Sequence, residues 1–322
     1  MHPKLKLCIF ENMKQRLLTF FIALGQKIKR FLESIPFPGL RGFSFYELLE
    51  LYVLGIIRGT LTARAGSISF SFFMALFPFL LFVLNLIPFI PLDNFDVILL
   101  EFLELLLPTE THTFFEDIFL DIQSKPRGGL LSSVFVLSVI LTANGVSAVF
   151  SGFEESYHIK LSRNFFKQYL YAVGVAFLLA ILLLLAVAIF VLFEYYILSR
   201  VAGNIPLNIN LFRWAQLVFI LILVYCSAAI LYFFGTIEGK KARIFSPGAL
   251  MTTLLLVITT YLFGIYLENF AQYNQLYGSI GALLIFLLYI WINANILLLG
   301  FELNAVLTRL RSNAQTSVRS YE

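Results

Sequence analysis

The stretch that decides the fold runs from Gly235 to Asn304 and contains two apolar segments joined by a short polar turn. The first segment opens with Ser246-Pro247-Gly248-Ala249 and continues to about residue 267. The second covers about 280–304 and ends in Gly300-Phe301-Glu302-Leu303-Asn304. A segment of about 20 apolar residues is long enough to cross the bilayer core as an α-helix. This stretch therefore predicts a transmembrane helical hairpin.

Composition extends the same interpretation to the whole chain. Of its 322 residues, 60% are hydrophobic and 13% are charged, whereas about 25% are charged in soluble domains. The mean hydropathy is +0.88. Further apolar windows lie near 65–90, 130–153, 169–196 and 212–234. We therefore predict an all-α polytopic membrane protein with six transmembrane helices.

The remaining segments predict three regions around this bundle. Residues 1–44 are basic and amphipathic, which fits either an interfacial helix on an anionic leaflet or a cytoplasmic helix packed on the bundle. Residues 45–305 form the six-span membrane domain, and 91–129 form an outer cap of acidic amphipathic helices. A capping box at Ser44 and Glu47 predicts a short helix before the first span. Residues 306–322 are expected to be a cytoplasmic tail.

The distribution of positive charge predicts the orientation. With both termini in the cytoplasm, 19 of the 23 Lys and Arg residues lie on the inner side. Positive charge is enriched in the cytoplasmic loops of membrane proteins. We therefore expect a multi-pass protein of a bacterial inner membrane with cytoplasmic N- and C-termini.

The sequence contains no motif typical of a catalytic or cofactor-binding site. The three histidines, His2, His112 and His158, are far apart and form no metal-ligand motif. Neither a phosphate-binding loop nor a dinucleotide-binding motif is present. We therefore expect no enzyme activity, no catalytic residue, no metal and no cofactor.

Polar residues at membrane depth are the main candidates for function. Asn144 lies in the second span, and Asn293 and Asn295 lie in the sixth. Such residues are costly in lipid and usually face a bundle interior or a cavity. One interpretation is hydrogen bonding that holds the helices together. The functional interpretation is a polar cavity that opens toward the cytoplasm.

Charged residues near the inner ends of the spans suggest a gate. Glu154 and Glu302 each follow a Gly-Phe pair at the end of a span, and Arg64 precedes the first span. We predict an ion pair between Arg64 and either Glu302 or Glu154, which closes the inner side next to Asn304. The alternative is ordinary anchoring by positive charge. The repeated Gly-Phe-Glu also suggests that spans one and two form a pseudo-repeat with spans five and six.

Seven short segments between residues 45 and 305 form a recognisable pattern. They are Thr62–Gly66, Ser69–Ser71, Leu76–Pro78, Arg163–Tyr169, Ser246–Ala249, the outer turn with Tyr273, Asn274, Tyr277 and Gly278, and Gly300–Asn304. This pattern resembles the YihY/BrkB family of bacterial inner-membrane proteins. The family more often has a small residue at the position of Phe301, and an asparagine would be expected at the position of Ser156.

The resemblance implies six transmembrane helices and no settled activity. Family members have been labelled as a tRNA-processing ribonuclease and as a serum-resistance factor, and others are linked to the movement of lipid precursors. From the residues we favour transport of an amphipathic or lipid-like solute through a polar cavity within the bundle. The alternatives are a non-catalytic envelope scaffold that binds lipid and, remotely, a membrane-associated ribonuclease. Expected partners are membrane lipids and an amphipathic substrate but no nucleic acid, and a homo-oligomer is left open.

Overall fold

The computed structural model describes residues 26–27, 29–30, 44–86, 131–159, 162–201, 209–237, 244–269 and 279–319. Three predictions lie outside these residues. They concern most of the 1–44 segment, the outer cap at 91–129, and the outer turn with Tyr273, Asn274, Tyr277 and Gly278.

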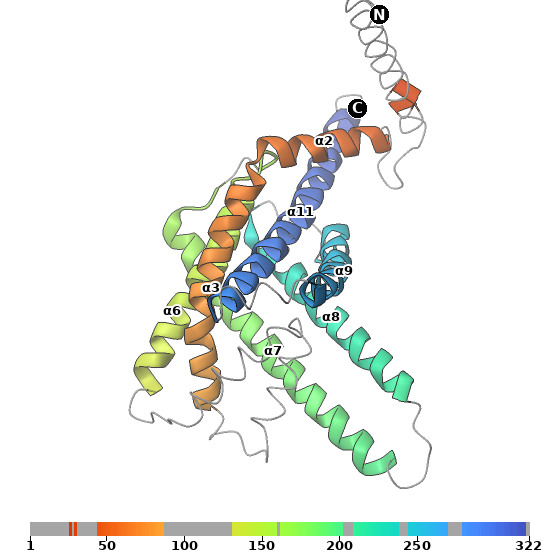
Figure 1. The fold of residues 1–322 in the computed structure, drawn as a ribbon. Coiled ribbons are helices and arrows are strands. Elements are labelled where there is room, and N and C mark those ends of the chain that lie inside the picture. The colour runs from red at the N-terminus through yellow and green to blue at the C-terminus, as the bar shows by residue number, and fades with distance from the viewer. Residues whose placement is uncertain are drawn as a thin grey trace, which may run out of the picture. The chain divides into compact units, whose positions relative to one another are not determined.

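The elements in the described residues are α-helices, which confirms the predicted all-α class (Figure 1). Their bounds are α2 Phe45–Arg58, α3 Leu61–Leu86, α6 Leu131–Glu154, α7 Phe165–Val201, α8 Ile209–Gly235, α9 Pro247–Asn269 and α11 Ser279–Arg319.

The helices have the length and composition of membrane spans. Within the described residues, parts of α6, α7, α8, α9 and α11 are long and apolar enough to cross a bilayer. In α3, which has 26 residues, the described stretch Leu61–Leu76 is a shorter apolar helix. The chain is therefore a multi-pass membrane protein, and the count of six spans stays a prediction.

Local sequence signals determine several helix ends. At the start of α2 the Ser44 backbone N–H donates to Glu47 Oε2 at 2.8 Å, and the Glu47 N–H donates to Ser44 Oγ at 3.3 Å. This reciprocal pair is the predicted capping box. Helix α9 begins at Pro247, whose missing N–H costs nothing at a first helical position. Helix α11 continues to Arg319, so the sixth helix does not end at Asn304 as predicted.

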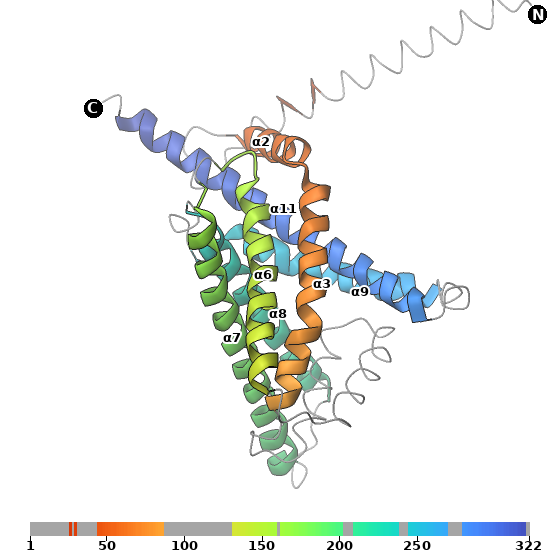
Figure 2. The same ribbon diagram turned by 90° about the vertical axis from the view of Figure 1, so that its left-hand side faces the viewer.

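By their contacts the residues fall into two compact units, one of 1–55 with 306–322 and one of 56–305. In the second unit α3 packs along α6, α6 along α7, α7 against α8, and α8 against α9. Helix α11 crosses α3 and α6 obliquely (Figure 2). Small residues such as Ala65, Ala172 and Ala228 are buried in the core of this unit, which lets neighbouring helices approach closely in lipid.

Helices α9 and α11 approach each other closely at two glycines. A Cβ atom on Gly248 would collide with the Gly300 carbonyl, and one on Gly300 would collide with Thr252 Oγ1. Only a residue without a side chain fits at either position. This crossing places Gly300 and Asn304 of α11 against the first turn of α9.

Candidate functional site

A buried ion pair joins the first turn of α3 to α11. The Arg64 Nη2 atom lies 2.8 Å from Glu302 Oε1, and the two residues are 2% and 0% exposed. The Ser156 hydroxyl donates to the other carboxylate oxygen of Glu302 at 2.8 Å. The structure thus contains the predicted contact between Arg64 and Glu302, and adds Ser156 to it.

Arg64 also interacts with the end of α6. Its Nη1 atom donates to the Gly152 carbonyl at 2.8 Å. Carbonyls in the last turn of a helix have no partner within the helix and carry partial negative charge. One guanidinium therefore holds α3, α6 and α11 together. We call Arg64, Gly152, Ser156 and Glu302 the ion-pair layer.

Glu154, the other predicted partner of Arg64, has a different contact. Its Oε1 accepts a hydrogen bond from the Arg163 backbone N–H at 3.2 Å. The Arg163 guanidinium donates to the Phe234 carbonyl in the last turn of α8 at 2.6 Å. Burial lowers the pKa of Arg163, whereas the charge of Glu154 acts in the opposite direction. Glu154 therefore helps to order the connection between α6 and α7.

The two Gly-Phe-Glu segments meet in space. The rings of Phe153 and Phe301 stack with centroids 4.2 Å apart and planes 7° apart. Tyr232 of α8 lies against both, with ring centroids 5.6 Å from Phe153 and 6.0 Å from Phe301. All three side chains are at most 4% exposed. We call Phe153, Tyr232 and Phe301 the aromatic layer. No pattern in the sequence indicates that these three residues cluster.

Hydrogen bonds fix the aromatic layer to the α9–α11 crossing. The Tyr232 hydroxyl bonds to Thr252 Oγ1 at 2.5 Å and donates to the Leu297 carbonyl at 2.7 Å. Asn304 accepts from the Gly248 N–H at 2.9 Å and donates to Ser246 Oγ at 2.8 Å. Asn304 thus caps the start of α9.

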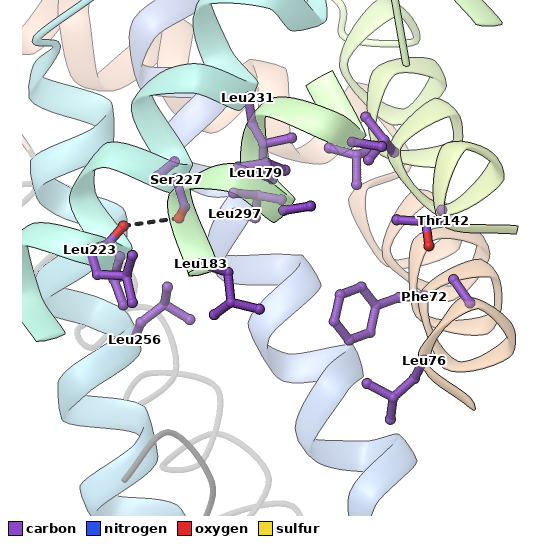
Figure 3. A pocket seen from close by; sticks show the side chains of 18 residues that line it. Phe72, Leu76, Thr142, Leu179, Leu183, Leu223, Ser227, Leu231, Leu256 and Leu297 are labelled. Atoms are coloured by element: carbon purple, nitrogen blue, oxygen red, sulfur yellow. Dashed lines mark hydrogen bonds between the residues drawn. The ribbon is translucent and has the colours of Figure 1, made fainter. Parts of the chain in front are cut away.

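An apolar cavity of about 450 Å³ lies among the helices of the 56–305 unit (Figure 3). Most of its wall is aliphatic, and among the described lining residues the side-chain oxygens belong to Thr142 and Ser227. The lining residues are Phe72, Ala75, Leu76, Thr142, Gly145, Val146, Val149, Ala176, Leu179, Ala180, Leu183, Leu223, Val224, Ser227, Ala228, Leu231, Leu256 and Leu297.

The three asparagines proposed to line a polar cavity are not part of this wall. Asn144 is exposed on the surface of α6. Asn295 is half-buried and donates to the Trp291 carbonyl of its own helix at 2.7 Å. Asn293 is half-buried, and its Oδ1 accepts no hydrogen bond from the described residues. This cavity is therefore apolar, and the polar cavity expected from the sequence stays a prediction.

The cavity ends next to the aromatic layer. Its lining residues Val149, Leu231 and Leu297 lie within about one helical turn of Phe153, Tyr232 and Phe301 respectively, since a turn has 3.6 residues. Beyond these rings, Arg64 and Glu302 close the same end with a charged contact. The cavity is thus a hydrocarbon-lined chamber. We call the aromatic layer and the Arg64–Glu302 ion pair together the seal, because they close one end of this chamber.

In the ranges that the structure describes, no three His, Cys, Asp or Glu side chains gather closely enough to hold a metal ion. The charged side chains of the site, Arg64 and Glu302, bond to each other.

Comparison with known proteins identifies the family. The family model described as "Virulence factor BrkB" matches residues 55–320. The chain belongs to the BrkB family. The match covers α3 to α11 and therefore the whole seal and the cavity, as the resemblance of the sequence motifs implied.

Several relatives are similar to this BrkB chain. The ribonuclease-like protein YfkH of Bacillus subtilis is 27% identical over 250 residues, which cover 76% of this chain and 89% of the relative. A UPF0761 membrane protein of Acinetobacter baylyi is 30% identical over 125 residues, or 37% of this chain and 30% of its own length. One from Xanthomonas oryzae pv. oryzae is 40% identical over 65 residues, or 20% and 15%. No solved structure matches the chain.

Proposed function

We propose that this BrkB-family protein transports an amphipathic, lipid-like solute, and that the apolar part of the solute occupies the cavity during passage. The observation that carries the proposal is the cavity itself, an apolar chamber of about 450 Å³ to which all six long helices contribute side chains. Small-molecule sites are typically about 300–1,000 Å³ in volume and largely apolar.

The aliphatic wall of the cavity supports occupation by an apolar group. Removing apolar surface from water is favourable by roughly 25 cal/mol per Å², and almost all of this wall is apolar. Apolar cavities hold water poorly because they offer it no hydrogen bonds. In a membrane, the apolar groups available to occupy such a cavity are the hydrocarbon chains of lipids.

The orientation of the chain in the membrane determines on which side the seal lies. We infer a bacterial inner membrane and cytoplasmic termini from the positive-inside distribution of Lys and Arg. In that orientation Arg64, Glu302 and the aromatic layer close the cytoplasmic end of the chamber. Passage of a solute then requires the seal to open and close again.

The proposal assigns this chain no catalytic group and no cofactor. The ribonuclease-like name belongs to YfkH, and none of the residues around the cavity favours cleavage of a phosphodiester. A scaffold without transport would need no chamber, and a solid bundle would serve it better. The chamber therefore favours transport over the scaffold.

Reconstitution into vesicles tests the proposal. A phospholipid with a fluorescent group on a short acyl chain is placed in both leaflets, and dithionite is added to bleach the outer one. We expect the protein to expose the inner-leaflet probe to bleaching much faster than protein-free vesicles do. Ala180→Phe, which places a phenyl ring in the cavity from α7, should abolish the acceleration, whereas Ala188→Phe on the outer face of α7 should keep it. Equal rates with and without protein would contradict transport.

A further inference from the structure

The chemistry of the cavity wall indicates which part of a ligand it accepts. Of the lining side chains, none is charged and two carry hydroxyl groups. The Ser227 hydroxyl donates to the Leu223 carbonyl of its own helix at 2.9 Å, as the dashed line in Figure 3 shows. The other hydroxyl group in the described wall belongs to Thr142, on the opposite side of the cavity. A sugar, a phosphate or an amino acid would lose its hydrogen bonds to water here without replacement.

The charged groups beyond the aromatic layer are engaged with one another. Glu302 accepts from both Arg64 and Ser156, and Arg64 also donates to the Gly152 carbonyl. A phosphate that competed for Arg64 would have to displace a buried carboxylate and pass the stacked rings of Phe153 and Phe301. Of the residues that the structure describes at this end of the cavity, Arg64 is therefore held by the protein's own carboxylate and carbonyl groups and is not available to a head group.

The geometry points to a binding site for a single hydrocarbon chain of a membrane lipid, with the lipid head group left outside the cavity. This inference rests on the cavity used for the proposed function and adds the class of group that it recognises. Recognition follows the chain and is indifferent to the charge of the head group, because the described wall is aliphatic apart from two hydroxyl groups and Arg64 and Glu302 are paired with each other. The selectivity-determining residues are then small and aliphatic ones such as Ala180, Leu183 and Leu256.

Photocrosslinking in vesicles tests this inference directly. The full chain is reconstituted with phosphatidylcholine or phosphatidylglycerol that carries a diazirine in the middle of one acyl chain. After irradiation, peptide mass spectrometry locates the labelled residues. Leu183 lines the cavity, whereas its neighbour Leu184 is 41% exposed on the outside of the bundle. The pair therefore separates labelling from within the cavity from labelling by bulk lipid.

We expect both lipids to label Leu183 and Leu256 to a similar extent, in addition to outward residues such as Leu184. In Ala180→Phe the labelling of the cavity residues should fall at least tenfold, and that of Leu184 should not change. In the matched variant Ala188→Phe, which adds the same ring to an exposed position of α7, both should be retained.

Labelling confined to outward residues in the unmodified protein would overturn the inference, whatever the variants do. So would cavity labelling by only one of the two lipids, since that result requires recognition of the head group. The outcome is separable from the transport assay. Cavity labelling without lipid movement would leave the chain site standing and refute the proposed function, and lipid movement without cavity labelling would do the reverse.

Discussion

Removing the partners of the Arg64–Glu302 ion pair, singly and together, measures how strongly the seal is held. Arg64→Leu leaves the Glu302 carboxylate fully buried with Ser156 as its remaining partner. Glu302→Gln leaves the Arg64 guanidinium buried beside the Gly152 carbonyl without a counter-charge. The double variant removes both charges at once.

The expected magnitudes follow from burial. Breaking a buried pair by deleting one charge typically destabilises by about 3–5 kcal/mol, because the other charge is left uncompensated. We therefore expect a loss of about 3–5 kcal/mol for each single variant. The double variant should be less destabilised than the sum of the singles by about 2–3 kcal/mol, the upper range of couplings between contacting residues.

The assay is equilibrium unfolding of the purified variants in mixed micelles, with far-UV circular dichroism as the readout. The free energies of unfolding of the four proteins are then combined in a double-mutant cycle. A matched pair of variants at Arg58 and Tyr157 provides a control, since their contact is exposed. That control should show a coupling below about 1 kcal/mol. Additive losses for Arg64→Leu and Glu302→Gln would refute the ion pair as the element that holds the seal.

Three further predictions concern packing and polarity. Gly300→Ala should destabilise the protein by about 1–3 kcal/mol in thermal unfolding, because its Cβ would collide with Thr252. Gly264→Ala should be neutral or stabilise by up to about 1 kcal/mol, because an added Cβ there meets no atom within 4 Å. Tyr232→Phe should cost about 1–2 kcal/mol in chemical unfolding, since it removes the bonds to Thr252 and the Leu297 carbonyl. Asn144→Leu should change stability by less than about 0.5 kcal/mol and leave fluorescent-lipid movement unchanged, because Asn144 is exposed and lies outside the cavity wall.

Each of these has a contrary result. Equal stability of Gly300→Ala and Gly264→Ala would mean that α9 and α11 do not cross as closely as described. Loss of lipid movement in Asn144→Leu would restore Asn144 to the transport path. A Tyr232→Phe variant as stable as the unmodified protein would mean that the hydrogen bonds of Tyr232 do not stabilise the aromatic layer.

Much of the fold was predictable because the bilayer imposes a length on each helix. The apolar windows correspond to α3, α6, α7, α8, α9 and α11, and the cap at Ser44 and the proline at 247 locate two helix starts. The Arg64–Glu302 contact joins residues 238 positions apart. It was predictable because few charges occur near the ends of the apolar segments, and a buried charge needs a partner.

The cavity wall could not be predicted for a physical reason. Helices α6 and α11 show little separation of polar and apolar faces, so the sequence pattern does not distinguish the buried face from the face toward lipid. Asn144 was therefore assigned to a cavity, although it is exposed. The stacking of Phe153 on Phe301 was equally hidden, because these are two among 36 phenylalanines. A cavity is also a matter of shape, which composition does not record.

If the cavity holds hydrocarbon, the protein should carry bound lipid when it is taken out of its native membrane. Protein is solubilised gently from native membranes, and the co-purified molecules are identified and quantified by mass spectrometry. We predict about one chain-bearing amphiphile per protein, which is lost in Ala180→Phe and retained in Ala188→Phe. A polar solute in its place, or equal amounts of lipid in both variants, would contradict the account.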